Sequence, residues 1–166
     1  MRKLVVILLV ALAVPAAALA RSGDRDDGTL VVQDASGTIQ IVAKGSILGR
    51  LDSGALTITD PNPNDAATPF VFGAERVVNR NDLTTVYRGK AIRFRFVSGR
   101  YTIKIVGTGV DLVAVGTGTL RITGAGTVDD GEYSLDGAPF KPVPFLMTPG
   151  AFGDQPATPR SIPVGG

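Results

Sequence analysis

Basic side chains alternate with large apolar ones over residues 91–105, and this pattern is the one in the chain best suited to binding. The run holds four cations, two on each side of the pair Ser98-Gly99. Guanidinium and ammonium groups are the donors that hold carboxylates and phosphates. The pattern therefore predicts a site for an anionic ligand, formed by Arg93, Arg95, Arg100 and Lys104.

The residue types that the chain lacks limit its chemistry. It contains no Cys and no His, which removes the thiol nucleophile, the usual general base near neutral pH and the usual transition-metal ligands. A pair of carboxylates could still cleave a glycosidic bond, although nothing in the sequence places two of them face to face. The acidic candidates are Glu75, Asp111, Asp129, Asp130 and Glu132. We predict a protein that is not an enzyme and uses no metal or cofactor, with a carboxylate-dependent hydrolase of an envelope polymer as the alternative.

The alternation itself predicts the element that positions the four cations. Side chains on a strand alternate between two faces, so period-two spacing on both sides of a Gly-containing two-residue link predicts a β-hairpin. With Ser98 and Gly99 as the loop, Arg93 lies directly opposite Lys104. Six apolar side chains then share the other face: Ile92, Phe94, Phe96, Tyr101, Ile103 and Ile105. The hairpin would have one core face and one cationic face.

The first half of the chain has the same character. Turn-like residues at 34–37 and 52–54 predict two further hairpins. Residues 38–59 also align without a gap on residues 102–123, and the glycines at the expected turns match as well. We interpret this as an internal duplication, two four-strand meanders of related shape. The apolar run from Leu112 to Val115 suggests a strand covered on both sides.

The predicted fold class is all-β, an antiparallel sandwich or small barrel built from two duplicated hairpin meanders, with an N-terminal signal helix and a Pro-rich tail. Seven prolines after Ala138 disfavour regular ladders, and we expect disorder from about Thr148. The predicted divisions are a signal peptide (1–20), a flexible linker (21–28), the β-domain with its repeat (29–137) and a partly disordered tail (138–166).

The N-terminus predicts export. Arg2 and Lys3 precede an apolar run, and Ala18-Leu19-Ala20 supplies small residues at the expected cleavage positions, so we expect cleavage after Ala20. An uncleaved anchor is the alternative. Without Arg2 and Lys3, basic and acidic residues are equal at 15 each, so no general affinity for nucleic acid is indicated.

Together these features predict a secreted or extracytoplasmic, non-catalytic β-domain with a structural or binding role at the cell envelope. The expected partner is an anionic envelope polymer or a lipid surface, with no transmembrane segment after cleavage. Nucleic acid is disfavoured because no base-stacking aromatics share the face of the cations. Two alternatives stay open: a subunit of a larger assembly, and basic residues that only solvate the sheet and protect its edges. The oligomeric state is left open.

Overall fold

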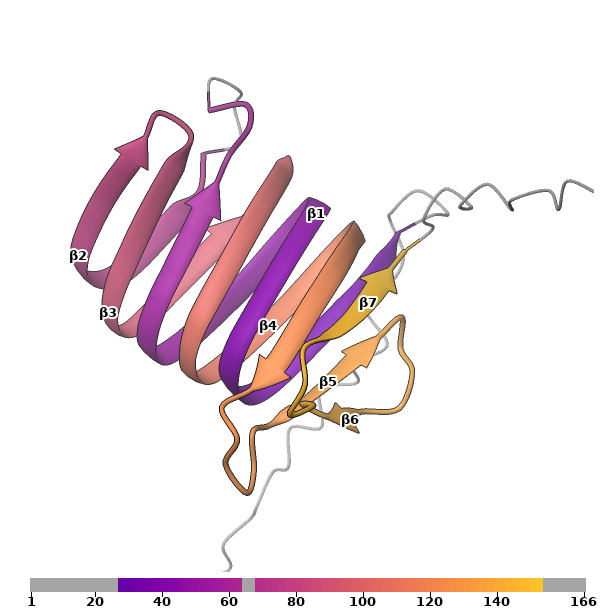
Figure 1. The fold of residues 1–166 in the computed structure, drawn as a ribbon. Coiled ribbons are helices and arrows are strands. Elements are labelled where there is room, and N and C mark those ends of the chain that lie inside the picture. Colours follow the sequence, from indigo (N-terminus) through magenta and orange to yellow (C-terminus); the bar gives the residue numbers. More distant parts are fainter. Residues whose placement is uncertain (1–26, 64–67, 154–166) are drawn as a thin grey trace, which may run out of the picture.

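The computed structural model describes residues 27–63 and 68–153, and every regular element within these ranges is a β-strand (Figure 1). The strands are β1 (Gly28–Thr59), β2 (Phe70–Asn81), β3 (Thr84–Phe96), β4 (Arg100–Gly124), β5 (Glu132–Leu135), β6 (Lys141–Pro142) and β7 (Thr148–Phe152). All their pairings are antiparallel. The all-β prediction is confirmed, and the sheet is not closed into a barrel. The predicted signal helix lies outside the described residues.

The two longest strands, β1 and β4, bend sharply at glycines. Gly45 and Gly54 in β1 have φ angles of 143° and 141°, and Gly116 in β4 has 139°. Glycine is essentially the only residue that adopts this region without strain. The corner glycines also face one another across the ladders: Gly45 pairs with Gly116, and Gly54 pairs with Gly107. Each bend is therefore shared by neighbouring strands, and the whole sheet folds back on itself.

Bending at these corners winds the strands into a coil. Gly28 and Gly45, seventeen residues apart, both pair with Gly116. Likewise Ile41 and Ile58 both pair with Ile103. One turn of β1 is thus 17 residues long, and a turn of β4 running the other way fills the space between two turns of β1. Figure 1 shows these turns as successive loops of ribbon, from β2 at one end to β5, β6 and β7 at the other.

The coil has two walls, which are defined by the registers of the ladders. The first wall contains residues 70–72 of β2, 92–96 of β3, 28–32 and 45–51 of β1, and 110–116 of β4. The second wall contains residues 74–81 of β2, 84–89 of β3, 37–44 and 54–59 of β1, and 100–107 and 117–124 of β4. Strand β5 extends the first wall and β7 extends the second. The inner faces of both walls share one apolar core.

The predicted alternation over residues 91–105 is confirmed. All six apolar side chains expected on one face are at most 2% exposed, and the four cations between them are exposed. Phe96 and Tyr101 stack with their ring centroids 4.7 Å apart. Such complete burial of large side chains is the main source of stability in a fold without disulfides.

The predicted hairpins are wrong. Strand β3 ends at Phe96 and β4 begins at Arg100, but β1 lies between them, with Ile47 as the partner of Phe96. Residues 34–37 and 52–54 are corners within β1, which continues through both. The physical reason is that a glycine with φ near 140° bends a strand without reversing it. The antiparallel partners of β1 are β3 and β4, which follow later in the chain.

The two repeated segments pair with each other. Thr38 is opposite Thr123 and Thr59 is opposite Thr102, so residues 38–59 run antiparallel to residues 102–123 in one register. A local twofold axis passes between them, close to the pair formed by Leu48 and Val113. The duplication therefore gives two halves of one double coil, and the prediction of two separate meanders is wrong.

The Pro-rich C-terminal segment is partly ordered, contrary to the prediction of disorder from Thr148. Strand β7 pairs with β4, and the side chain of Phe152 is completely buried. Strand β7 is at the edge of the sheet, which is where a proline such as Pro149 is tolerated within a ladder. Residues 154–166 lie outside the described part of the chain.

Candidate functional site

The structure separates the four predicted site residues into two pairs. Arg93 and Arg95 lie on the outer face of the first wall, whereas Arg100 and Lys104 lie on the outer face of the second. Arg93 is flanked by Arg50 of β1 and Phe72 of β2. Its predicted opposition to Lys104 is therefore wrong, because the hairpin that would have created it does not exist.

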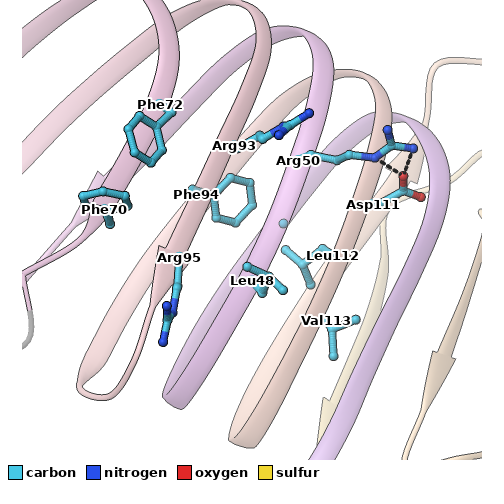
Figure 2. Close-up of a pocket in the computed structure, with 11 residues that line it drawn as sticks. Leu48, Arg50, Phe70, Phe72, Arg93, Phe94, Arg95, Asp111, Leu112 and Val113 are labelled. Carbon is cyan, nitrogen blue, oxygen red and sulfur yellow. Dashed lines mark hydrogen bonds and ion pairs between the residues drawn. The ribbon is translucent and has the colours of Figure 1, made fainter. Parts of the chain in front are cut away.

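Arg93 and Arg95 border a groove on the outer face of the first wall (Figure 2). The groove has a volume of about 480 Å³ and draws its lining from four neighbouring strands. Strand β2 supplies Phe70 and Phe72 on one side, while β1 and β4 supply Leu48 and Val113 on the other. Its size is that of a small-molecule site.

Apolar side chains that point outward give the groove its character. Phe70, Phe72 and Leu48 are 56%, 57% and 59% exposed, and the two Phe rings meet edge to face with centroids 4.3 Å apart. Sequence reasoning missed these residues. One signal was present in the run from Leu112 to Val115, which is apolar on both faces. We interpreted that run as a doubly covered strand, but Val113 is 42% exposed and belongs to the groove.

The groove has a rigid floor. Gly49 and Phe94 face each other across β1 and β3, and the ring of Phe94 occupies the space that a side chain at position 49 would need. An aromatic ring over a cross-strand glycine is a recurrent way of filling the gap that glycine leaves in a sheet. Position 49 faces the core, as the buried Ile47 and Leu51 on either side of it do, so the floor here is backbone supported from the inner face by a buried ring.

Charge in the groove is unevenly neutralised. Arg50 makes an ion pair with Asp111, with both Nε and Nη2 at 2.6 Å from Oδ2. The hydrogen bond and the negative charge of Asp111 raise the pKa of Arg50 above its ordinary value. Asp111 also accepts a hydrogen bond of 2.9 Å from the backbone N–H of Asp34. Arg93 and Arg95 have no acidic partner within the described residues.

A second groove lies on the outer face of the second wall. It has a volume of about 600 Å³, and its charged lining residues are Arg80, Arg88 and Lys104. No acidic side chain lines it. Lys104 is the one predicted site residue that it contains, and Arg100 lies in neither groove.

Comparison with known proteins adds no assignment. No family model, no curated protein and no solved structure matches this chain. The part of the chain that the structure describes also contains no helix with the length and apolarity needed to cross a membrane.

The carboxylates considered for catalysis do not form a pair in either groove. Asp111 is the one acidic residue that lines either groove, and it is held by Arg50. Asp130 caps a loop and accepts hydrogen bonds from Thr127 and from the backbone N–H of Gly126. The bond from the Thr127 hydroxyl, supported by the backbone donors and opposed by burial, lowers the pKa of Asp130. Residues 27–63 and 68–153 also contain no cluster of acidic side chains suited to a metal ion.

Proposed function

We propose that this protein is an exported, non-catalytic binding domain of the cell envelope whose ligand is an anionic amphiphile. The ligand is a carboxylate or phosphate group that carries an apolar tail. One observation carries the proposal: Arg93 and Arg95, which lack an acidic partner in the described chain, border a groove lined by outward-facing apolar side chains.

The two arginines supply the recognition of charge. Their neighbour Arg50 already has an ion pair with Asp111. An anion entering the groove would therefore meet the guanidinium groups of Arg93 and Arg95, which have no acidic partner in the described chain. A planar guanidinium donates two parallel hydrogen bonds to a carboxylate or a phosphate. Because the hydrogen bonds involve charged groups, each contributes roughly 1.5–3 kcal/mol to binding.

The apolar residues supply the recognition of a tail. Phe70, Phe72 and Leu48 are each more than half exposed, and all three line one groove instead of being scattered over the surface. Contiguous apolar patches of this kind mark binding sites in soluble proteins. A ligand with an apolar tail gains by covering them, since burial contributes about 25 cal/mol for each Å² removed from water.

The surroundings of Asp111 support binding without turnover. Its carboxylate is engaged by Arg50 and by the backbone N–H of Asp34, and no second carboxylate lines the groove. General acid–base catalysis at a glycosidic bond needs two carboxylates on either side of the bond.

Titration calorimetry with dodecyl phosphate, kept below its micellar concentration, tests the proposed ligand class. Dodecyl maltoside supplies the same tail without charge, and inorganic phosphate supplies the charge without the tail. We expect dodecyl phosphate to bind at least about tenfold more tightly than either. The double variant Arg93→Gln/Arg95→Gln should lose this advantage, whereas the charge-matched control Arg100→Gln/Arg121→Gln should keep it. Equal binding of dodecyl maltoside, or equal losses in both variants, would refute the proposal.

The proposed location rests on residues 1–20 and is tested separately. Mass spectrometry of the N-terminus of protein recovered from the envelope fraction or the medium should find a chain that begins at Arg21. A chain that keeps its apolar N-terminal run and sediments with membranes would support the uncleaved anchor instead.

A further inference from the structure

The geometry points to a second binding surface, independent of the first, on the outer face of the second wall. We propose that the groove bordered by Arg80, Arg88 and Lys104 binds a linear polyanion, a chain with regularly spaced phosphate or carboxylate groups. The two grooves lie on opposite walls of the coil with the apolar core between them. Binding at one therefore needs no residue of the other.

The groove is a trough that runs along β1. Its floor is formed by small residues of that strand, including Ala55 and Thr57. On one side Ala55 pairs with Arg88 of β3, and on the other Thr57 pairs with Lys104 of β4. Neighbouring strands are about 4.8 Å apart, so the two rims are separated by roughly 10 Å. This width admits one extended polymer chain.

The rims carry positive charge that the described residues do not neutralise. Arg80, Arg88 and Lys104 come from three different strands, and none has an ion pair within residues 27–63 and 68–153. The acidic residues nearest to Arg80 and Arg88 in sequence, Glu75 and Asp82, do not line the trough. Three cations around a low floor create a positive potential that attracts a polymer with many negative charges.

The basic side chains lie on a fixed support. Val86 points outward, because its neighbours Tyr87 and Thr85 pair with the inward-facing Leu56 and Ile58. Val86 is nevertheless only 5% exposed. Arg80, Arg88 and Lys104 line the same groove, and the methylene stems of such side chains can pack on an apolar surface while their charged ends stay in water. Ordering these stems in advance lowers the entropic cost of binding.

The lining favours a simple polyanion over the other anionic macromolecules. Nucleic acids bound as single strands need aromatic side chains on which bases stack, and the trough has none. A membrane presents a plane of head groups, which cannot enter a trough about two strand spacings wide. A chain of repeating charged units can lie along the floor and contact both rims.

Binding of long-chain inorganic polyphosphate at several salt concentrations tests this proposal. The triple variant Arg80→Gln/Arg88→Gln/Lys104→Gln should lose at least about tenfold in affinity at low salt. Its plot of log affinity against log salt should flatten by about two units, since each lost cation removes about 0.7 released counterions. The control Lys44→Gln/Arg100→Gln/Arg121→Gln removes the same charge from the same wall outside the trough and should retain most of the affinity.

Further arms of the experiment separate the alternatives. Orthophosphate alone should bind weakly, and vesicles containing phosphatidylglycerol should bind no better to the native protein than to the trough variant. Thermal unfolding of both triple variants checks that they fold. The variant Arg80→Lys/Arg88→Lys, which keeps the charge and the native Lys104, should retain most of the affinity of the native protein. Equal losses in the two triple variants would reduce the effect to net charge and overturn the proposal. Vesicle binding that depends on the trough residues would favour a lipid surface and also overturn it.

Discussion

Phe152 lies with its ring over Gly118, close enough that a Cβ atom on Gly118 would be 2.7 Å from the ring. Phe152 is completely buried, although it lies within the Pro-rich segment. We expect Phe152→Ala to lower the free energy of unfolding by about 3–5 kcal/mol, because it opens a cavity in the core. Urea denaturation measures this loss. Met147→Ala, at a side chain that is 39% exposed, should cost far less, and equal losses would mean that Phe152 is not part of the core.

The corner glycines should be intolerant of any side chain. Gly116 has a φ of 139°, and a Cβ atom there would collide with the carbonyl oxygen of Lys44. We expect Gly116→Ala to lower the free energy of unfolding by about 3 kcal/mol, from backbone strain and steric overlap together. Gly137 has a φ of 72° and open space around it, so Gly137→Ala should cost only about 1 kcal/mol. Similar losses at the two positions would contradict the close approach of the strands at the corner.

Truncation of two adjacent residues on β4 should change the free energy of unfolding by very different amounts. Ile103 is completely buried and Thr102 is exposed. Ile103→Ala should cost about 2–5 kcal/mol in denaturant unfolding, and Thr102→Ala should stay within about 0.5 kcal/mol. A large loss at Thr102 would show that the outer face of the second wall is covered.

The local pattern predicted side-chain direction but not strand partners. Phe94 and Ile103 were correctly assigned to the core because alternation depends only on neighbouring residues in an extended chain. The pair Ser98-Gly99 and the glycines at positions 37 and 54 fit both a hairpin loop and a corner. The difference depends on which strands lie alongside, and for β1 those strands are β3 and β4. No local signal contains this information.

The candidate site was predicted in part for the same reason. Arg93 and Arg95 were correctly expected to point outward, but the residues beside them depend on the partner strands. Phe72 borders Arg93 because β2 pairs with β3, and Arg50 borders it because β1 does. The apolar residues beside the two arginines therefore could not be predicted without the pairing of the strands.

Acid should destabilise the protein partly through Asp130. Its folded-state pKa is lowered from the ordinary value of 3.8, chiefly by the hydrogen bond from Thr127. A lowered pKa means that the ionised form stabilises the fold. This contribution is complete above the unfolded-state pKa and is lost as the pH falls through the folded-state pKa. We expect Asp130→Asn to reduce the drop in Tm between pH 7 and pH 3. The exposed control Asp82→Asn should leave the drop as in the native protein, and an unchanged drop in Asp130→Asn would contradict this role.

Releasing Arg50 should strengthen binding in the first groove. Asp111→Asn removes the charge that holds Arg50, and the Asn side-chain oxygen can still accept the bond from the Asp34 N–H. The side chains of Arg50 and Asp111 are 61% and 35% exposed, so loss of the pair should cost less than about 1 kcal/mol in stability. With a third guanidinium available, the affinity for dodecyl phosphate should rise about two- to fivefold in calorimetry. Weaker binding would show that Asp111 itself contacts the ligand.

The winding of β1 with β4 also determines the order in which the chain can acquire its structure during synthesis. None of the 32 residues of β1 has a ladder partner before Thr84, and the inner turns need β4 as far as Gly124. Pairing over such sequence distances is slow, because the entropy of closing long loops must be overcome first. The nascent chain therefore stays unfolded until most of it has left the ribosome. For the exported protein proposed here, that delay leaves an extended polypeptide that a translocation pore can thread before the coil closes.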